Sequence, residues 1–262
     1  MKYTVLTLFP EIIDAFFSNS IMAKAIKKGV IEYNPVNIRD FAADKHKTCD
    51  DAPYGGGAGM LMLAEPLAKA LDFAGAKRGI RDRSSNNNPR SPIPDPPHVI
   101  YLSPSGKPFT QDTAKELAAE QELILICGRY EGIDQRIIDL YVDEEISIGN
   151  YVLSSGEVAA LAVIDATYRL VDSVICAQSL DEESFSGGLL EYPQFTRPEV
   201  FDTIKVPEVL LSGHHEQIRL WRLEKRVEKT LKKRPDLIQR GRELGIFNSE
   251  INSIIDRLIN RK

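Results

Sequence analysis

The sequence predicts an α/β protein with a mostly parallel sheet, followed by a smaller helical domain. Short apolar runs alternate with helical patterns as far as residue 171, an order typical of parallel strands joined by helical crossovers. Beyond residue 188 the apolar residues recur at helical spacing, over 218–231 and 246–259. We therefore expect a sheet domain over 1–176, a flexible acidic linker over 177–188 and an all-helical domain over 189–262.

Each element of the first domain follows from a local pattern. The strands are runs rich in apolar and β-branched residues, expected at 3–9, 36–38, 98–102 and 123–127. The helices carry apolar residues at near-helical spacing, expected at 10–28, 66–74, 110–121, 133–141 and 156–171. Ser154 and Glu157, three positions apart, predict a capping box at the start of the last helix.

The stretch 123–156 indicates where a ligand binds. Its strand ends in Gly128, and a second glycine-bearing loop at 147–151 follows about 20 residues later. Glycine lets the backbone approach a ligand closely. Ligands of open α/β sheets bind beyond the carboxyl ends of the strands. We therefore expect a small-molecule site formed by these loops.

Composition narrows the class of protein. The chain has 262 residues and 43% hydrophobic content, enough for a sizeable core. Three widely spaced cysteines argue against a disulfide framework or a cysteine-based zinc site, and for a reducing cytoplasm. No run of 18 or more apolar residues and no signal peptide is found, so no membrane partner is expected.

Two loops and one charged segment have a composition that sets them apart from the predicted strands and helices. The region 39–62 is expected to be loop-like, and its glycines resemble a phosphate cradle, but the Lys-Ser/Thr ending of a P-loop is missing. We interpret it as a flexible loop or as one that lies flat against a ligand or an RNA base. We assign no chemical role to the loop 75–97. Residues 219–234 hold eight Lys/Arg and two Glu, which indicates a solvated helix face or a contact with phosphates.

An ordered set of motifs runs through nearly the whole chain. It comprises LFPE at 8–11, RDF at 39–41, DDAPYGGGAGM at 50–60, YLSPSG at 101–106, CGRYEGID at 127–134, DEEISIGNYVLSSGE at 143–157, TRPEV at 196–200 and VPEVLLSG at 206–213. In this order the motifs resemble the TrmD family of bacterial tRNA (guanine-N1)-methyltransferases, of the SPOUT class.

The resemblance implies a SPOUT-type sheet with a deep trefoil knot and loops that bind S-adenosylmethionine. It implies an obligate homodimer with each active site between subunits, and a helical second domain that binds tRNA. The implied reaction methylates N1 of guanosine 37 in a tRNA that has guanosine at position 36. The implied cofactor residues are Tyr101, Leu102, Ser103, Pro104, Gly128, Tyr130, Glu131, Gly132, Ser147, Ile148, Gly149, Asn150, Tyr151, Val152, Leu153 and Gly156.

The reaction needs a base, because guanine N1 is protonated at neutral pH, and a cation or donor to stabilise charge spreading toward O6. The family's arginine falls on Arg169. The family has an Asp directly before Ser-Phe, where this chain has Glu183, so the base is Glu183 or, two residues earlier, Asp181. Ser155 and Ala159 also depart from the family, which usually has Gly and often has Pro there.

Magnesium dependence is implied as well, and Glu131 is the first carboxylate to test. Two alternatives stay open. One is a knotted methyltransferase with another RNA target, and the other is a non-catalytic RNA-binding protein that responds to S-adenosylmethionine.

Overall fold

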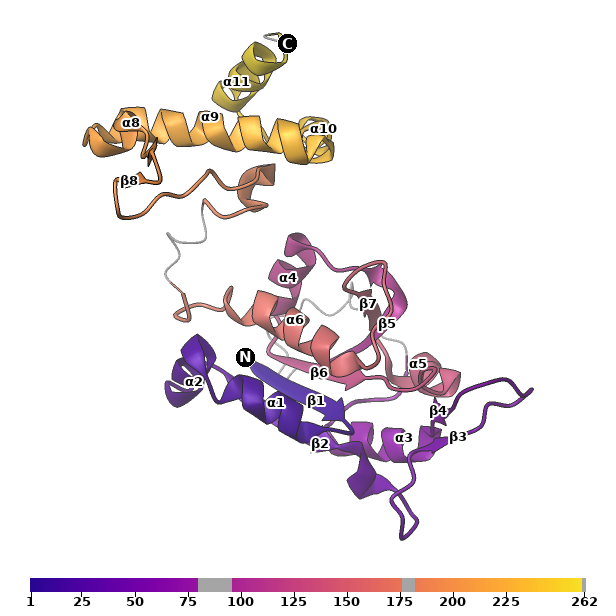
Figure 1. The fold of residues 1–262 in the computed structure, drawn as a ribbon. Coiled ribbons are helices and arrows are strands. Elements are labelled where there is room, and N and C mark those ends of the chain that lie inside the picture. The colour runs from indigo at the N-terminus through magenta and orange to yellow at the C-terminus, as the bar shows by residue number, and fades with distance from the viewer. Residues whose placement is uncertain (80–95, 176–181, 261–262) are drawn as a thin grey trace, which may run out of the picture. The chain divides into compact units, whose positions relative to one another are not determined.

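A computed structural model describes residues 1–79, 96–175 and 182–260. The chain divides into two compact units, Met1–Ile175 and Cys176–Lys262. Figure 1 draws both units as ribbons.

A five-stranded parallel sheet forms the centre of the first unit. Its strands lie in the order β2-β1-β6-β5-β7, and every neighbouring pair is parallel. Their bounds are β1 Lys2–Thr7, β2 Glu32–Asn37, β5 His98–Pro108, β6 Glu122–Cys127 and β7 Glu144–Ser147. The mixed α/β prediction with a mostly parallel sheet is therefore confirmed.

Helices cover both faces of this sheet (Figure 1). Their bounds are α1 Pro10–Phe17, α2 Ser20–Lys27, η1 Ile38–Phe41, α3 Ala64–Phe73, α4 Gln111–Ala118, α5 Gln135–Tyr141 and α6 Gly156–Tyr168. Side chains of a strand alternate between faces, so Leu123 and Leu125 of β6 join one core with α1, α2, α4 and α6. Ile124 and Ile126 join the other core, with η1, α3 and α5.

The helix predicted over 10–28 is two helices. The Ser18 hydroxyl and the Asn19 side-chain amide both donate to the Ala15 carbonyl, at 3.0 and 2.8 Å. Short polar side chains that bond to nearby main chain in this way compete with continued helix formation. The strand predicted at 36–38 is longer, and Pro35 is tolerated in it because β2 is an edge strand.

The region 39–62 is not entirely loop. Besides η1, it contains β3 Asp50–Asp51 and β4 Leu61–Met62, which pair antiparallel. They close the base of the glycine-rich segment between them. The interpretation of this region as a simple flexible loop is wrong for these residues. A strand pair of two residues on each side is too short to be recognised among polar residues and glycines in a sequence.

The second unit is largely helical. Its elements are η3 Ser186–Gly188, β8 Val200–Phe201, β9 Ile204–Lys205, α8 Glu208–Leu211, α9 His215–Lys233, α10 Pro235–Glu243 and α11 Ser249–Ile259. Its core holds the side chains of Leu189, Val227, Ile238, Phe247, Ile254 and Ile255. The expectation of an all-helical domain is wrong in one respect, because β8 and β9 form a hairpin across Asp202 and Thr203, which both have positive φ.

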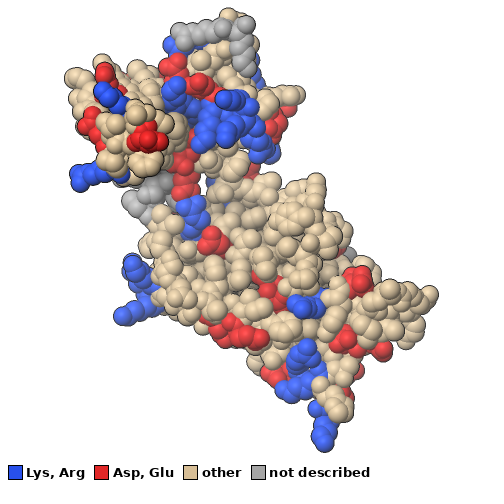
Figure 2. All heavy atoms as spheres, in the orientation of Figure 1, with Lys and Arg blue, Asp and Glu red and all other residues tan. Residues whose placement is uncertain are grey.

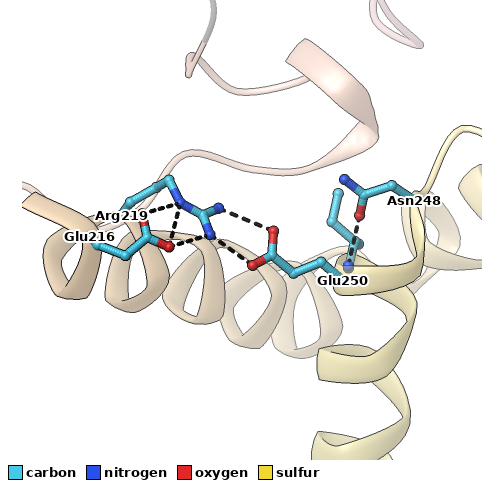
Figure 3. Close-up of polar contacts among 5 residues, drawn as sticks. Glu216, Arg219, Asn248 and Glu250 are labelled. Carbon is cyan, nitrogen blue, oxygen red and sulfur yellow. Dashed lines mark hydrogen bonds and ion pairs between the residues drawn. The ribbon is translucent and has the colours of Figure 1, made fainter.

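Arg219 joins two helices of this unit (Figure 3). Its guanidinium donates to Glu216 on its own helix and to both carboxylate oxygens of Glu250 on α11, at 2.8 and 3.0 Å. Asn248 caps α11 by accepting a hydrogen bond from the Ile251 amide. In the described residues, no helix is both long and apolar enough to cross a membrane.

Candidate active site

Three loops meet at one edge of the sheet. Two of them follow β6 and β7, and the third lies within β5, where its pairing with β7 shifts register between Leu102 and Lys107. The three strands are neighbours in the sheet. Together with the start of α6 the three loops line one cavity. Of the sixteen residues that the sequence assigned to a ligand, fifteen line this cavity, and Asn150 does not.

Sequence reasoning missed five lining residues. They are Arg129, Ile146, Ser154, Ser155 and Ala159. Four of them adjoin assigned residues in the same loops, and Ala159 lies one helical turn beyond Ser155. The two departures from the family pattern, Ser155 and Ala159, therefore both face the ligand cavity.

The loop after β6 is a tight turn. The Gly132 amide donates to the Arg129 carbonyl at 3.1 Å, and Tyr130 has a φ of +59°. Gly132 has a φ of +135°, a conformation that side chains rarely tolerate. Tyr130, Glu131 and Gly132 of this turn all line the cavity.

The glycine-rich segment is attached to this same turn. The Glu131 amide donates to the Met60 carbonyl, and the Met62 amide donates to the Gly132 carbonyl, both at 3.0 Å. At Gly59 a Cβ would lie 2.4 Å from the Glu131 side chain. The segment therefore lies against the turn that lines the cavity.

The first turn of α6 packs directly on the end of β6. The Gly156 amide donates to the Gly128 carbonyl at 2.8 Å. A Cβ at position 156 would lie 2.7 Å from Cys127 Cα and 2.8 Å from the Gly128 nitrogen. Glycine is therefore required here by space, because main-chain atoms cannot move aside.

The predicted capping box is wrong. Ser155 is the N-cap residue of α6, and its side chain makes no capping hydrogen bond. Glu157 turns into the interior, where its Oε1 accepts a 2.5 Å hydrogen bond from the Thr7 hydroxyl. The sequence spacing predicted a local contact, but the carboxylate has a partner on β1, far away in the chain.

Tyr101 lies beneath the cavity. Its ring is 2.9 Å from the point where Gly128 would carry a Cβ. Burial raises the pKa of this tyrosine, and the Glu145 carboxylate acts in the same direction. A tyrosine hydroxyl is protonated at neutral pH even at its ordinary pKa, and the upward shift keeps it able to donate a hydrogen bond in more alkaline solution.

The loop after β7 is stabilised by internal hydrogen bonds. The Tyr151 amide donates to the Gly149 carbonyl at 2.9 Å, and the Ser147 hydroxyl donates to the same carbonyl at 3.1 Å. Beyond it, Val152 is 84% exposed although it is apolar.

The two predicted catalytic residues lie in different units. Arg169 is half-buried at the C-cap of α6 in the first unit. Glu183 is half-buried in the second unit, and its main-chain carbonyl accepts a hydrogen bond from the Ser186 amide. Asp181, the alternative base, lies outside the described residues.

The fold and cavity define an α/β protein with a ligand site at the strand ends, built mainly from main chain, small residues and aromatic rings. The family described as tRNA (guanine-1)-methyltransferase TrmD matches residues 1–240. A tRNA (guanine-N(1)-)-methyltransferase of Treponema denticola is 60% identical over 260 residues, covering 99% of this chain and 100% of that protein.

Two further relatives carry the same name. The one from Treponema pallidum is 55% identical over 258 residues, covering 98% of this chain and 96% of that protein. The one from Borreliella burgdorferi is 57% identical over 239 residues, covering 90% and 92%. This chain belongs to the TrmD family of tRNA (guanine-N1)-methyltransferases.

Proposed function

We propose that this protein transfers a methyl group from S-adenosylmethionine to N1 of guanosine 37 in a tRNA with guanosine at position 36. Membership of the TrmD family supports the reaction. The observation that carries the proposal is the convergence of the three predicted loops and Gly156 on one cavity.

The cavity fits the cofactor by its chemistry. Gly128, Gly132, Gly149 and Gly156 all line this space, so the main chain can approach adenine and ribose closely there. The apolar side chains of Ile148 and Leu153 line the same space and can cover a ring. S-adenosylmethionine supplies an electrophilic methyl group when bound.

We assign two further roles to this chain's own residues. Glu183 removes the N1 proton of guanine, which makes N1 nucleophilic. Arg169 stabilises the negative charge that then spreads toward O6. Both residues lie in the part of the chain that matches the family. Asp181 is the alternative base.

A homodimer is part of the proposal, with each active site between subunits. Tyr151, Val152, Leu153 and Val158 are apolar and exposed beside the cavity, and Val152 and Val158 are exposed by 84% and 56%. Exposed apolar side chains that lie close together on a protein surface often mark a contact with another protein chain. A deep trefoil knot in the sheet domain is also part of the proposal, and family membership supports it.

We propose that the second unit binds tRNA and that the protein works in the cytoplasm. Lys and Arg side chains gather on one visible part of this unit (Figure 2). Two of the arginines expected to contact phosphates have partners within the unit, since Arg222 pairs with Glu182 and Arg226 donates to main-chain carbonyls. These two guanidinium groups bond within the unit itself, as do Lys225, which pairs with Glu228, and Lys229, which donates to the Glu191 carbonyl.

We assign no binding site to magnesium. In the part of the chain that the structure describes, no group of three or more His, Cys, Asp or Glu side chains is placed to bind a metal ion. Glu131 lines the cavity and is the carboxylate to test. We assign no step to the ion.

The experiment uses purified protein, methyl-labelled S-adenosylmethionine and two tRNA transcripts. Both have guanosine at position 36, and they have guanosine or adenosine at position 37. Digestion to nucleosides should yield labelled 1-methylguanosine from the first transcript and no label from the second. Magnesium and chelator are compared in parallel.

Other results would redirect the proposal. Label in a different nucleoside would favour a methyltransferase with another RNA target. Bound cofactor and tRNA without label, with and without magnesium, would favour a non-catalytic RNA-binding protein.

A further inference from the structure

The segment 182–192, which carries Glu183, is closed on itself by side-chain hydrogen bonds. The Tyr192 hydroxyl donates to Glu182 Oε2 at 3.0 Å, joining the two ends. The Ser184 hydroxyl oxygen accepts a hydrogen bond of 3.1 Å from the Glu191 amide. The segment therefore has a defined path within the second unit.

The turn inside this segment is held by main chain and by the core. The Phe185 amide donates to the Leu189 carbonyl at 2.7 Å, and Phe185 has a φ of +74°. Leu189 is 1% exposed and packs with Val227 and Phe247. Removing this large apolar side chain from water is favourable, so it anchors the turn to the helices.

Cations of α9 complete the attachment. Arg226 Nη2 donates to the Ser186 carbonyl at 2.7 Å, and its Nε donates to the Leu190 carbonyl at 3.4 Å. Lys229 donates to the Glu191 carbonyl at 2.9 Å. These carbonyls flank Leu189, so Arg226 spans the turn and holds both of its sides.

Arg226 is half-buried in this position. Burial is the main cause that lowers the pKa of its guanidinium, opposed by the charge of Glu182. A planar guanidinium can serve two carbonyls at fixed angles, which a lysine ammonium cannot reproduce. The geometry is therefore specific for arginine.

We propose that Arg226 is a positioning residue for methyl transfer, acting through the turn that carries Glu183. This inference rests on the proposed function and on Glu183 as its base. Arg226 would hold the turn in one conformation, which keeps the Glu183 carboxylate in the position from which it reaches guanine N1. A displacement of about 1 Å in a catalytic group can cost roughly 100-fold in rate.

The test compares four variants with the wild-type chain in steady-state methylation of tRNA with guanosine at 36 and 37. Arg226→Ala should lower kcat at least tenfold, with the dissociation constants for S-adenosylmethionine and tRNA within threefold of wild type. Arg226→Lys should recover part of this loss. Tyr192→Phe removes only the hydroxyl that joins the ends of the segment, and should lower kcat several-fold.

The control is Arg242→Ala. Arg242 lies on α10 and pairs with Asp256 on α11, so this variant deletes the same charge without touching the segment. It should retain wild-type kcat. Melting temperatures of all variants are measured first, and the assays are run at least 15 °C below the lowest one, so that lost folding is not mistaken for lost positioning.

Wild-type kcat in Arg226→Ala and Tyr192→Phe would overturn the positioning role. So would a loss that appears entirely in tRNA affinity, since that result would make Arg226 a phosphate contact. If Arg226→Ala does not fold, Arg226→Lys decides the question, and wild-type kcat in that variant would overturn the positioning role. An inactive wild-type chain would contradict the proposed function instead, which keeps the two failures distinct.

Discussion

The hydroxyl of Thr7 donates a 2.5 Å hydrogen bond to Glu157 Oε1, and the two residues are 0% and 1% exposed. Thr7 is the last residue of β1, and Glu157 is the second residue of α6. The Thr7 oxygen also accepts a 2.9 Å hydrogen bond from the Phe9 amide. A buried polar pair thus ties the start of α6, and the cavity wall at Gly156, to the centre of the sheet.

Thr7→Val should destabilise the protein by about 2–3 kcal/mol, because it leaves a buried carboxylate oxygen and a main-chain amide without their partner. The free energy of unfolding from urea titration measures the loss. The control is Thr4→Val on the same strand, since Thr4 donates to Glu122, whose side chain is 22% exposed and can be rehydrated. Equal losses in the two variants would contradict the importance of the Thr7–Glu157 pair.

Gly156→Ala should reduce the affinity for S-adenosylmethionine at least tenfold. The added Cβ would collide with main-chain atoms of Cys127 and Gly128, so α6 must move away from the cavity. Helix propensity alone predicts that this substitution stabilises α6, since alanine favours a helix by roughly 1 kcal/mol over glycine. Isothermal titration calorimetry measures the affinity.

The matched control for this variant is Ser155→Ala. Ser155 lines the same cavity, and its side chain makes no capping hydrogen bond. Its affinity should stay within threefold of wild type. Unchanged affinity in Gly156→Ala would show that the close packing of α6 on β6 does not shape the cofactor site.

Glu183→Gln should abolish turnover while leaving S-adenosylmethionine affinity nearly unchanged, because the amide keeps the shape of the side chain and cannot accept the N1 proton. Single-turnover methylation of tRNA measures the effect, with Asp181→Asn as the companion variant. Full activity in Glu183→Gln, with loss in Asp181→Asn, would transfer the base to Asp181.

Cys127 should not react with a thiol reagent in the folded protein. It is 1% exposed, and burial raises the pKa of its thiol, as does the charge of Glu157. The nucleophile is the thiolate, so raising the pH from 7 to 9 should not accelerate the reaction. Cys49 is also 1% exposed, and burial raises its pKa.

The measurement is reaction with an aromatic disulfide in a Cys176→Ser background. Two thiols should react after unfolding in urea, and neither within minutes before it. Rapid labelling of the folded chain at Cys127 would show that the end of β6 opens readily.

The double variant Val152→Asp, Val158→Asp should convert a dimer into a monomer, because two charges would have to be buried in the contact. Light scattering after size-exclusion chromatography gives the mass. Leu140→Asp is the control, since Leu140 is also exposed but lies on α5, whose buried residues pack on the opposite face of the sheet. A dimer that survives the double change would place the contact elsewhere.

Much of the fold follows from local patterns. The buried strands β1 and β6 were expected at nearly their observed positions, because continuous apolar runs bounded by turns are typical of parallel strands. The start of β5 was expected, but the strand continues to Pro108, since a register shift lets the polar residues after Leu102 rejoin β7. The break between α1 and α2 was not expected, since it depends on where two polar side chains donate. The β3–β4 pair and the β8–β9 hairpin are each too short to leave a pattern.

The sequence alone determined the alternation of strands and helices, the family, and the loops that line the cavity. It could do so because a strand and the loop that follows it are specified by adjacent residues. The tertiary structure decided what distant residues do together. Glu157 turned from a predicted cap to a buried partner of Thr7, and Arg226 turned from a basic surface residue to a support of the turn beyond Glu183. Such contacts join positions separated by 150 and 40 residues, and no local pattern of charge or periodicity specifies which distant atom a side chain meets.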